Sequence, residues 1–363
     1  MKLKAITLLM ILVMGIISCR TRTSLLPEAP LSMTDTLHIK DFVDSVAYVH
    51  LEYREDCILN SVSQIILLGS TYILVDGSKE NNCLYLFGTD GNFIRSIRWF
   101  GRGPGEYLSI TSVDIYNRDS SIYLYDNTGG KVHNYNLSGN YLRSFNSDGI
   151  IAGDFKIIGN SEVAFYSPDE PAFIGNSTIP RGLFTYDYDA NSFSSVIEHP
   201  QTYELIRVFN SNWFTEFGDS IGLLSAYDGN FYRFSNGSFK LIRVFKFPHK
   251  DLAIPVSESD LVFKANPVES GNYIFFYAFF KNGAQFHPVL FDKSEGVGSI
   301  SNGIKGFHRK QLPVFLGSGQ SAFLGLVYPD KLEGMELERI EKQLGTKLTH
   351  GENPLLAIYF LKK

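Results

Sequence analysis

Short apolar runs separated by turn residues fill the chain from residue 62 onward. The first four runs lead into a glycine-rich loop, and four further runs follow it in the same order. The eight runs occupy residues 64–68, 71–75, 84–87, 93–99, 111–116, 121–125, 131–136 and 141–145. Runs of this length, rich in β-branched and aromatic residues and bounded by Gly, Asn and Asp, are typical of strands. The pattern predicts two successive four-stranded antiparallel meanders.

The two meanders match each other in detail. Residues 74–77 (LVDG) correspond to residues 124–127 (LYDN), so Asp76 and Asp126 hold equivalent places. A repeat of about fifty residues made of four short strands is typical of a β-propeller blade. The loop that contains three glycines near Arg102 therefore ends one blade and begins the next.

The rest of the chain continues this pattern less regularly. Further blades are predicted at 150–199 and 205–247, followed by strands at 273–280, 289–292, 297–300, 323–328 and 355–361. Apolar residues at helical spacing predict an inserted amphipathic helix over 330–347.

The last predicted blade lacks one strand, and the alternating run at 46–51 stands alone ahead of the first blade. Pairing the two would leave no apolar blade face open. We therefore expect an all-β chain that forms a six-bladed β-propeller of four-stranded antiparallel blades. It is closed by this N-terminal strand and carries a short inserted helix near the C-terminus.

The residues of the first two blades also carry a family resemblance. Residues 74–82, 84–87, 90–95 and 101–107 resemble an NHL-type blade. The whole chain is similar to the six-bladed β-propeller lipoproteins of Bacteroides-type bacteria, with their NHL-like and TolB-like blades. This resemblance implies the propeller fold and a location in the cell envelope, and it implies no defined activity.

The N-terminus has the features of an export signal. Lys2 and Lys4 precede an apolar run over 6–17, and residues 16–19 (IISC) resemble a bacterial lipobox. In proteins with that motif the signal is removed before the cysteine, which is then lipidated. We therefore expect Cys19 to carry the lipid; an ordinary signal peptide or an uncleaved anchor is the alternative.

These features divide the chain into a signal peptide over 1–18, a tether over 19–40 and the propeller domain over 41–363. Surface-export signals of these bacteria carry acidic residues after the lipidated cysteine. In this chain Arg20 and Arg22 follow Cys19 instead. We expect an outer membrane lipoprotein, with the periplasmic side favoured over the cell surface.

Composition and charge narrow the partners. Aromatic residues make up 14% of the chain and glycine contributes 32 residues, as suits a many-stranded β protein. The formal net charge is -5, and removing residues 1–18 with two lysines makes it -5 - 2 = -7. This balance argues against a nucleic-acid partner. Cys57 and Cys83 remain after Cys19, and both a disulfide and two buried thiols are open for them.

The glycine-rich loop combines rings and charges. Gly103-Pro104-Gly105 predicts a tight, rigid reversal, flanked by Arg102 and Glu106. The candidate partner-binding residues are Trp99, Arg102, Glu106 and Tyr107. In the alternative interpretation the two charges pair with each other or with backbone, and the rings cover the core.

The aspartates at the ends of predicted strands are the candidate metal ligands. Asp76, Asp126 and Asp228 would lie at one face of a propeller, where their oxygens could hold Ca²⁺. Alternatively, each caps its own turn by accepting backbone N–H bonds. The eight histidines show no zinc-binding spacing, and the chain lacks a Gly-x-Ser-x-Gly elbow and a phosphate-binding loop.

Two functional hypotheses follow. The first is a monomeric, lipid-anchored binding or scaffolding module, without cofactor, for a protein or glycan partner. The alternative is a Ca²⁺-dependent lactonase-like or esterase-like hydrolase with its site at the axial mouth of the propeller.

Overall fold

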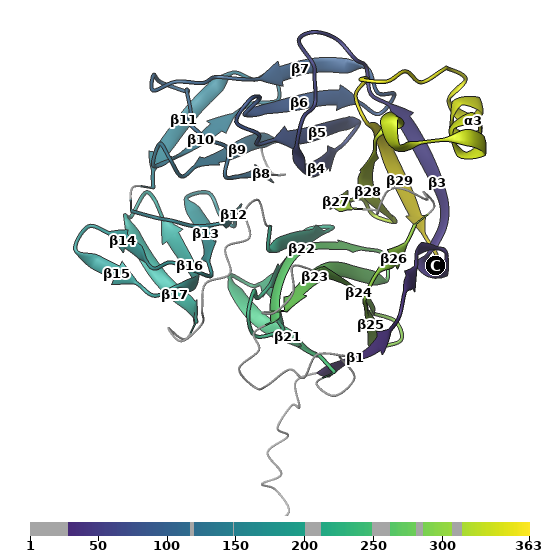
Figure 1. The fold of residues 1–363 in the computed structure, drawn as a ribbon. Helices are drawn as coiled ribbons and strands as arrows, with labels where there is room; N and C mark the ends of the chain where they lie inside the picture. Colours follow the sequence, from purple (N-terminus) through teal and green to yellow (C-terminus); the bar gives the residue numbers. More distant parts are fainter. Residues whose placement is uncertain are drawn as a thin grey trace, which may run out of the picture.

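The computed structural model describes residues 28–116, 120–147, 149–199, 212–248, 262–280, 286–306 and 314–363. Residues 1–27, with Cys19 and the predicted signal peptide, lie outside this part. Figure 1 shows sheets arranged around a common centre, toward which β4, β8, β12, β22 and β27 face. The chain is all-β with a propeller-like arrangement of four-stranded antiparallel sheets. In the described ranges, no helix has the length and apolar character needed to cross a membrane.

The first three sheets each contain four antiparallel strands. Sheet 1 consists of β4 (Val62–Leu68), β5 (Thr71–Asp76), β6 (Cys83–Gly88) and β7 (Phe93–Ile97). Sheet 2 consists of β8 (Ser112–Tyr116), β9 (Ser121–Asp126), β10 (Lys131–Tyr135) and β11 (Tyr141–Asn146). Sheet 3 consists of β12 (Asp154–Ile157), β13 (Glu162–Ser167), β16 (Gly182–Asp187) and β17 (Ser192–Glu198). A hairpin of β14 (Ala172–Ile174) and β15 (Ser177–Ile179) is inserted into sheet 3.

The next two sheets are joined by an N-terminal strand. Sheet 4 consists of β18 (Phe214–Phe217), β19 (Ser220–Leu224), β20 (Asn230–Ser235) and β21 (Ser238–Lys246). Sheet 5 consists of β22 (Val262–Ser270), β23 (Tyr273–Phe280), β24 (Phe286–Asp292) and β25 (Val297–Ser301). Strand β1 (Glu28–Thr34) runs parallel to β21 with its first three residues and parallel to β25 with its last four. It therefore bridges the outer edges of both sheets.

Sheet 6 combines the two ends of the chain. It consists of β27 (Phe315–Ser318), β28 (Ala322–Val327), β29 (Leu355–Leu361) and β3 (Val43–His50). Strand β2 (Leu37–His38) pairs with β26 (Ile304–Lys305), and a short helix α2 (Ile39–Phe42) leads into β3. A 3₁₀ turn (Pro329–Lys331) and helix α3 (Gly334–Leu344) connect β28 to β29, and Ile340 of α3 is buried.

Apolar cores lie between successive sheets. In the described residues, six clusters of buried side chains join sheets 1 and 2, 2 and 3, 3 and 4, 4 and 5, 5 and 6, and 6 and 1. The last of them packs Ile65 and Phe87 against Leu324 and Leu356. Burial of one large apolar side chain contributes about 1.5–3 kcal/mol. Each sheet is therefore held mainly by its two neighbours.

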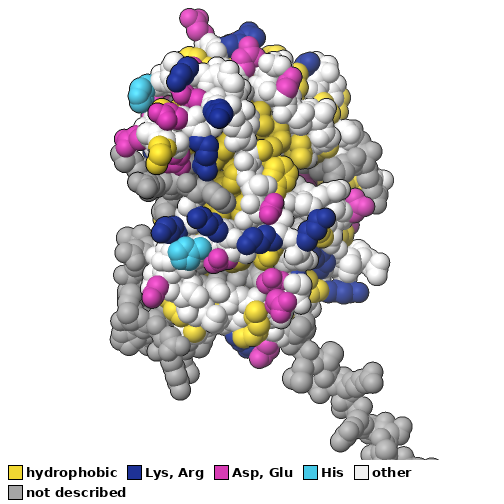
Figure 2. Space-filling model, turned by 90° about the vertical axis from the view of Figure 1, so that its right-hand side faces the viewer, with side chains coloured by type: hydrophobic (Ala, Val, Ile, Leu, Met, Phe, Trp, Pro, Cys, Tyr) yellow, Lys and Arg dark blue, Asp and Glu magenta, His cyan; other side chains and the backbone are white. Residues whose placement is uncertain are grey.

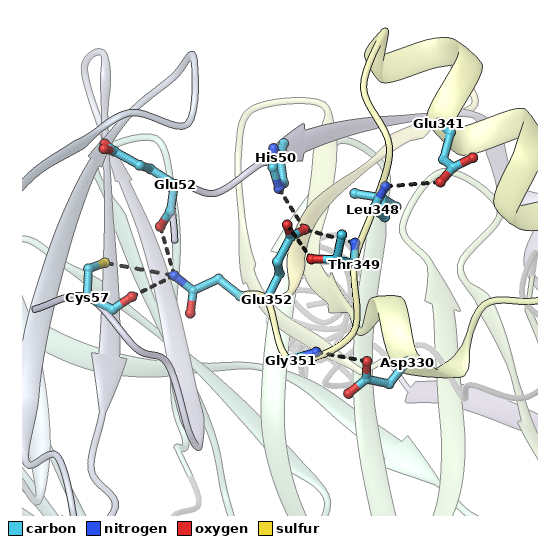
Figure 3. A network of polar contacts seen from close by, with 10 residues as sticks. His50, Glu52, Cys57, Asp330, Glu341, Leu348, Thr349, Gly351 and Glu352 are labelled. Carbon is cyan, nitrogen blue, oxygen red and sulfur yellow. Dashed lines mark hydrogen bonds and ion pairs between the residues drawn. The ribbon is translucent and has the colours of Figure 1, made fainter. Parts of the chain in front are cut away.

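A buried amide holds the loop that connects sheet 6 to sheet 1. Asn353, just before β29, donates its side-chain N–H groups to the carbonyls of Glu52 and Cys57 at 2.8 and 2.7 Å, and its Oδ1 accepts the Leu59 N–H at 2.9 Å. Beside it, Glu352 lies 3.3 Å from His50 of β3 (Figure 3). These bonds hold the chain before β29 against the loop after β3. Cys57 lies in this loop as a free thiol, and Cys83 is likewise free and buried.

Several expected elements are present, and one differs. The run predicted as a lone strand at 46–51 lies in β3, which pairs antiparallel with β29, with Val46 opposite Tyr359. The predicted helix is present, although it is shorter than the predicted range. Residues 28–34 and 37–40 were placed in the tether, but they form β1, β2 and the first residues of α2. Pro30 is tolerated there because β1 is an added edge strand.

The face that carries β3 and α3 mixes polar and apolar surface. Figure 2 shows Lys and Arg side chains in a row across its middle, interrupted by acidic side chains, with an elongated strip of hydrophobic side chains above the row.

Candidate functional site

The glycine-rich loop between β7 and β8 is a closed, hydrogen-bonded unit. The Tyr107 N–H donates to the Trp99 carbonyl at 2.8 Å, and the Gly101 N–H donates to the Tyr107 carbonyl at 3.1 Å. Gly105 has a φ of +76°, and a Cβ at this position would lie 2.6 Å from the Tyr141 ring. Glycine is therefore required there both by backbone conformation and by close packing.

The loop separates its four candidate residues into buried and exposed positions. Tyr107 is fully buried, and its hydroxyl lies 2.9 Å from the carbonyls of both Asn82 and Ile97. Glu106 accepts the Gly103 N–H at 2.7 Å, so its charge serves the turn and does not pair with Arg102. Both residues act inside the loop rather than at its surface.

Trp99 and Arg102 face solvent. Trp99 is 51% exposed, and its indole N–H donates to the Gly139 carbonyl of sheet 2 at 3.2 Å, which fixes the ring. The adjacent Phe100 is 67% exposed. Arg102 is exposed, and within the described residues its guanidinium has no ion-pair or hydrogen-bond partner. We call Trp99, Phe100, Arg102 and Tyr141, whose ring is 37% exposed, the aromatic rim.

Asp76 and Asp126 have equivalent structural roles. Asp76 accepts the N–H groups of Asn60 and Ser78 at 2.7 and 3.1 Å, and Asp126 accepts those of Leu108 and Gly129 at 2.7 and 2.9 Å. Each carboxylate joins the segment entering a sheet to the turn at the end of its second strand. Burial alone would raise the pKa of Asp76, but the hydrogen bonds from Asn60 and its turn outweigh burial and lower it.

Asp228 is placed differently. It is exposed and accepts the backbone and side-chain N–H groups of Asn230 at 3.0 and 2.9 Å, within its own turn. Across the ranges that the structure describes, no three Asp, Glu, His or Cys side chains come together as a metal site. The oxygens of the three aspartates are instead used by turns. The calcium site stays a prediction.

An axial cavity holds charges that the sequence did not single out. The first strands of all six sheets line this cavity of about 120 Å³. Lys156 of β12 forms ion pairs with Asp114 of β8 and, at 2.6 Å, with Glu216 of β18. Burial would lower the pKa of Lys156, but these two carboxylates outweigh it and raise the pKa. The amine is therefore held as an ammonium ion and is not a nucleophile.

Asp154 connects three sheets next to this cavity. It is buried at the start of β12, and its Oδ2 accepts the N–H groups of Trp213 and Phe214 at 2.7 and 3.0 Å, while its Oδ1 accepts the Ser112 hydroxyl at 2.6 Å. Burial raises the pKa of this carboxyl, and the four groups around it act in the opposite direction. Asp154 therefore fixes the relative positions of β8, β12 and β18.

Tyr166, His199 and Lys264 form a second buried group of polar side chains, near Trp213. The Ala226 N–H donates to the Tyr166 hydroxyl at 2.7 Å, and the same hydroxyl forms a hydrogen bond with Nε2 of His199 at 2.8 Å. Burial lowers the pKa of His199 and favours its neutral form. Burial also lowers the pKa of Lys264 on β22 to about 7, with Asp228 acting in the opposite direction.

The repeat pattern does not identify these buried charged residues, but another feature of the sequence does. Asp114 and Glu216 are each the single charge of a short first strand, and Lys156 and Lys264 each share a first strand with one acidic residue, Asp154 or Glu269. A lone charge in a buried strand requires a partner. The partners lie in other sheets, so only the structure identifies them.

Comparison with known protein families shows which family the chain belongs to. The profile described as "Domain of unknown function (DUF4934)" matches residues 26–360. The chain belongs to the DUF4934 family. The match begins just before β1 and ends within β29, so the family domain takes in both strands that bring the N-terminal segment into the sheets. A search of the curated proteins found no match to this DUF4934 chain.

Two solved structures resemble this DUF4934 protein. One is a protein of Bacteroides fragilis assigned as exported, with a TM-score of 0.71 and 15% sequence identity, covering 93% of this chain and 99% of that one. The other is a DUF4221 family member from Bacteroides vulgatus, with a TM-score of 0.53 and 11% identity, covering 88% and 97%. At these identities the likeness concerns the fold alone.

Proposed function

We propose that the protein is a six-bladed β-propeller, anchored to the cell envelope through Cys19, that binds a protein or glycan partner through the aromatic rim. The six sheets serve as the blades. Three observations support the ring: the six first strands line one cavity, an apolar core joins sheet 6 to sheet 1, and β3 pairs with β29. The rim lies on the first two blades, where the NHL-like and TolB-like resemblance is strongest.

The envelope location rests on the N-terminal sequence. Basic residues, an apolar run and a small-residue-cysteine motif occur in the order that lipoprotein export requires. The structural likeness to a Bacteroides fragilis protein assigned as exported agrees with this location. We therefore propose an outer membrane lipoprotein, with the periplasmic side favoured over the cell surface.

The aromatic rim carries the binding proposal. Two residues with rings, 51% and 67% exposed, share a hydrogen-bonded loop with Arg102, whose guanidinium is unpaired among the described residues. Aromatic residues and Arg are enriched at recognition surfaces, because aromatic rings bury large areas and a guanidinium offers several hydrogen-bond donors. We prefer binding to the calcium-dependent hydrolase, because Asp76, Asp126 and Asp228 already use their oxygens in turns.

The test places a photocross-linking amino acid at Phe100 of the full-length protein in its native membrane. We expect an adduct of defined size, which disappears when Arg102→Ala and Trp99→Ala are combined with it. Protease treatment and glycosidase treatment of the adduct then distinguish a protein partner from a glycan.

Phe173 provides the matched control, because it is an exposed ring, at 51%, on the inserted hairpin of sheet 3. The same cross-linker at Phe173 is expected to give no such adduct. Equal adducts from both positions, or an adduct that survives the double substitution, would contradict binding at the rim.

A further inference from the structure

A cavity of about 400 Å³ lies beside the axial cavity, where sheets 2, 3 and 4 meet. Strands β8, β12, β18, β19 and β20 contribute residues to its walls, and β8 and β12 face the common centre of the sheets in Figure 1. Cavities of this volume hold ligands of the size of a substituted ring. The residues that line it therefore indicate the chemistry of such a ligand.

Most of the cavity wall is apolar. Six apolar or aromatic side chains line the cavity: Ile115, Tyr116, Ile157, Ile158, Ile221 and Phe234. Burying the apolar surface of a ligand against such a wall is favourable, because water is removed from both surfaces. Aromatic rings also attract cations over their faces. The wall therefore suits a ligand with an apolar body.

The charged residues of the same wall are acidic. Glu216 of β18 and Asp219 of the turn after β18 line the cavity, and none of its described lining residues is Lys, Arg or His. Like-signed charges in a cleft with apolar walls attract ions of the opposite sign. The cavity should therefore attract cations and repel anions.

Lys156 lies next to Glu216 but does not neutralise the acidic group. Its Nζ pairs with Asp114 and, at 2.6 Å, with Oε1 of Glu216, so one ammonium is shared by two carboxylates. One negative charge remains on this group of three. Lys156 lines the axial cavity of about 120 Å³ and is absent from the wall of the larger cavity.

Glu216 offers a carboxylate oxygen to the cavity. Its side chain is 36% exposed, whereas that of Asp114 is 1% exposed. Within the ranges that the structure describes, Oε2 of Glu216 has neither a hydrogen-bond nor an ion-pair partner. The ion pair of Oε1 with Lys156 therefore fixes the carboxylate and leaves Oε2 for a ligand.

Glu216 also lines a cavity of about 370 Å³ on its other side, which suits a cation less well. Phe217 lines that cavity, and the ammonium of Lys293 lies 4.1 Å from the centre of the Phe217 ring. A second cation there would be repelled by this ammonium. The cavity between sheets 2, 3 and 4 is therefore the better site for a cation.

We propose that this cavity binds a small organic cation with an apolar body, of the arylalkylamine class. The ammonium group of the ligand donates to Oε2 of Glu216, near Asp219, and its ring packs against Ile115 and Phe234. A charge-assisted hydrogen bond and burial of the ring act together. An anion is repelled, a neutral ring leaves the carboxylate uncompensated, and a metal ion alone leaves the apolar wall in water.

The site is separate from the aromatic rim. Neither Trp99, Phe100, Arg102 nor Tyr141 lines the cavity, so either proposal can fail without the other.

The experiment measures binding of 2-phenylethylamine, which is protonated at pH 7, to the detergent-solubilised full-length protein by calorimetry. We expect saturable binding that Glu216→Gln weakens about tenfold or more, because the charged acceptor is lost. The variant keeps the Lys156 ion pair with Asp114. Partition of the amine into detergent is measured in detergent buffer alone and subtracted.

Three further probes separate the charge from the ring. The neutral 2-phenylethanol has the ring without the charge, methylamine has the charge without the ring, and 3-phenylpropionate has the ring with the opposite charge. Each is expected to bind at least about tenfold more weakly than the amine. Added salt is expected to weaken the amine complex.

Glu198→Gln is the matched control. It removes one negative charge from exposed Glu198 of β17, which does not line the cavity, and should leave the affinity for the amine unchanged. Thermal unfolding checks that each variant is folded. Ile221→Trp, which fills the cavity from β19, replaces Glu216→Gln if the latter is unfolded, and it should also weaken binding about tenfold or more. Absence of saturable amine binding, equal affinity for any of the three other probes, or unchanged affinity in the folded cavity variant would each overturn the proposal.

Discussion

The carboxylate of Asp154 accepts the backbone N–H of Trp213 at 2.7 Å, although 59 residues separate them. It is one of three bonds that this buried side chain makes to the two neighbouring sheets, the others being to Ser112 and Phe214. We expect Asp154→Ala to lower the free energy of unfolding by about 3–5 kcal/mol, because buried donors lose a charged partner. Urea unfolding followed by tryptophan fluorescence measures the change. Asp90→Ala serves as control, since exposed Asp90 bonds only within its own turn; an equal loss there would contradict this role of Asp154.

Acid stability should depend on Asp76. Its pKa in the folded protein lies below the ordinary value of 3.8, so the unfolded chain takes up the proton at a higher pH than the folded one. The stabilisation is complete above the unfolded pKa and is lost as the pH falls through the folded pKa. We expect Asp76→Asn to cost about 1–3 kcal/mol at pH 7 and to flatten the acid limb below pH 4. Unfolding curves between pH 2 and 7 test this, with exposed Asp228→Asn expected to change little.

Lys264 should make the free energy of unfolding depend on pH above 7, whereas Asp76 does so in acid. Its pKa is about 7 in the folded protein against 10.5 ordinarily, so the unfolded chain binds a proton between these values and the folded chain does not. Stability is therefore greatest above the unfolded pKa and falls as the pH falls toward 7. We expect unfolding free energy to rise by about 2 kcal/mol from pH 7 to 9. Lys264→Met should remove the slope, whereas exposed Lys240→Met should keep it.

The turn between β6 and β7 approaches the backbone of β3 closely. Gly91 has a φ of +88°, and a Cβ there would lie 2.1 Å from the His50 carbonyl oxygen. Gly91→Ala is expected to cost about 2 kcal/mol or more, since strain and steric overlap combine. Gly175→Ala shares the positive φ in open space and isolates the strain alone. Thermal denaturation of both variants separates the two contributions, and equal losses would show that the contact with β3 is loose.

Cys19 determines membrane attachment in our proposal. Cys19→Ser should move the protein from the membrane fraction to the soluble fraction and abolish incorporation of a labelled fatty acid. Cys57→Ser keeps the lipidation motif intact and should change neither result. Persistent membrane attachment of Cys19→Ser without label would instead indicate an uncleaved anchor.

The repeating strands were predictable because their pattern is local. In sheets 1 and 2 each strand is a short apolar run ended by Gly, Asn or Asp, and Asp76 and Asp126 mark the same place in both. Strand β1 was missed because its parallel pairing depends on two distant edges, while Pro30 suggested a linker. Local patterns do not encode such pairings.

The candidate sites were predictable only in part. The reversal at Gly103-Pro104-Gly105 fixed the loop, and Trp99 and Arg102 reach the surface, as the partner-binding interpretation requires. The sequence did not reveal that Tyr107 points inward, because an aromatic residue suits either side of a loop. The two partners of Glu269, Arg233 and Lys293, come from sheets 4 and 5, and no spacing along the chain relates them.

Strand β1 also determines how the protein would respond to mechanical load. Because β1 lies parallel to β21 and β25, a pull on Glu28 along the strand loads its hydrogen bonds in shear, all at once, rather than unzipping them one by one. The load is divided between two sheets whose apolar faces already pack together. A protein tethered by its N-terminus would thus withstand tension at its attachment point while the distant sheets 1 to 3 remain unstrained.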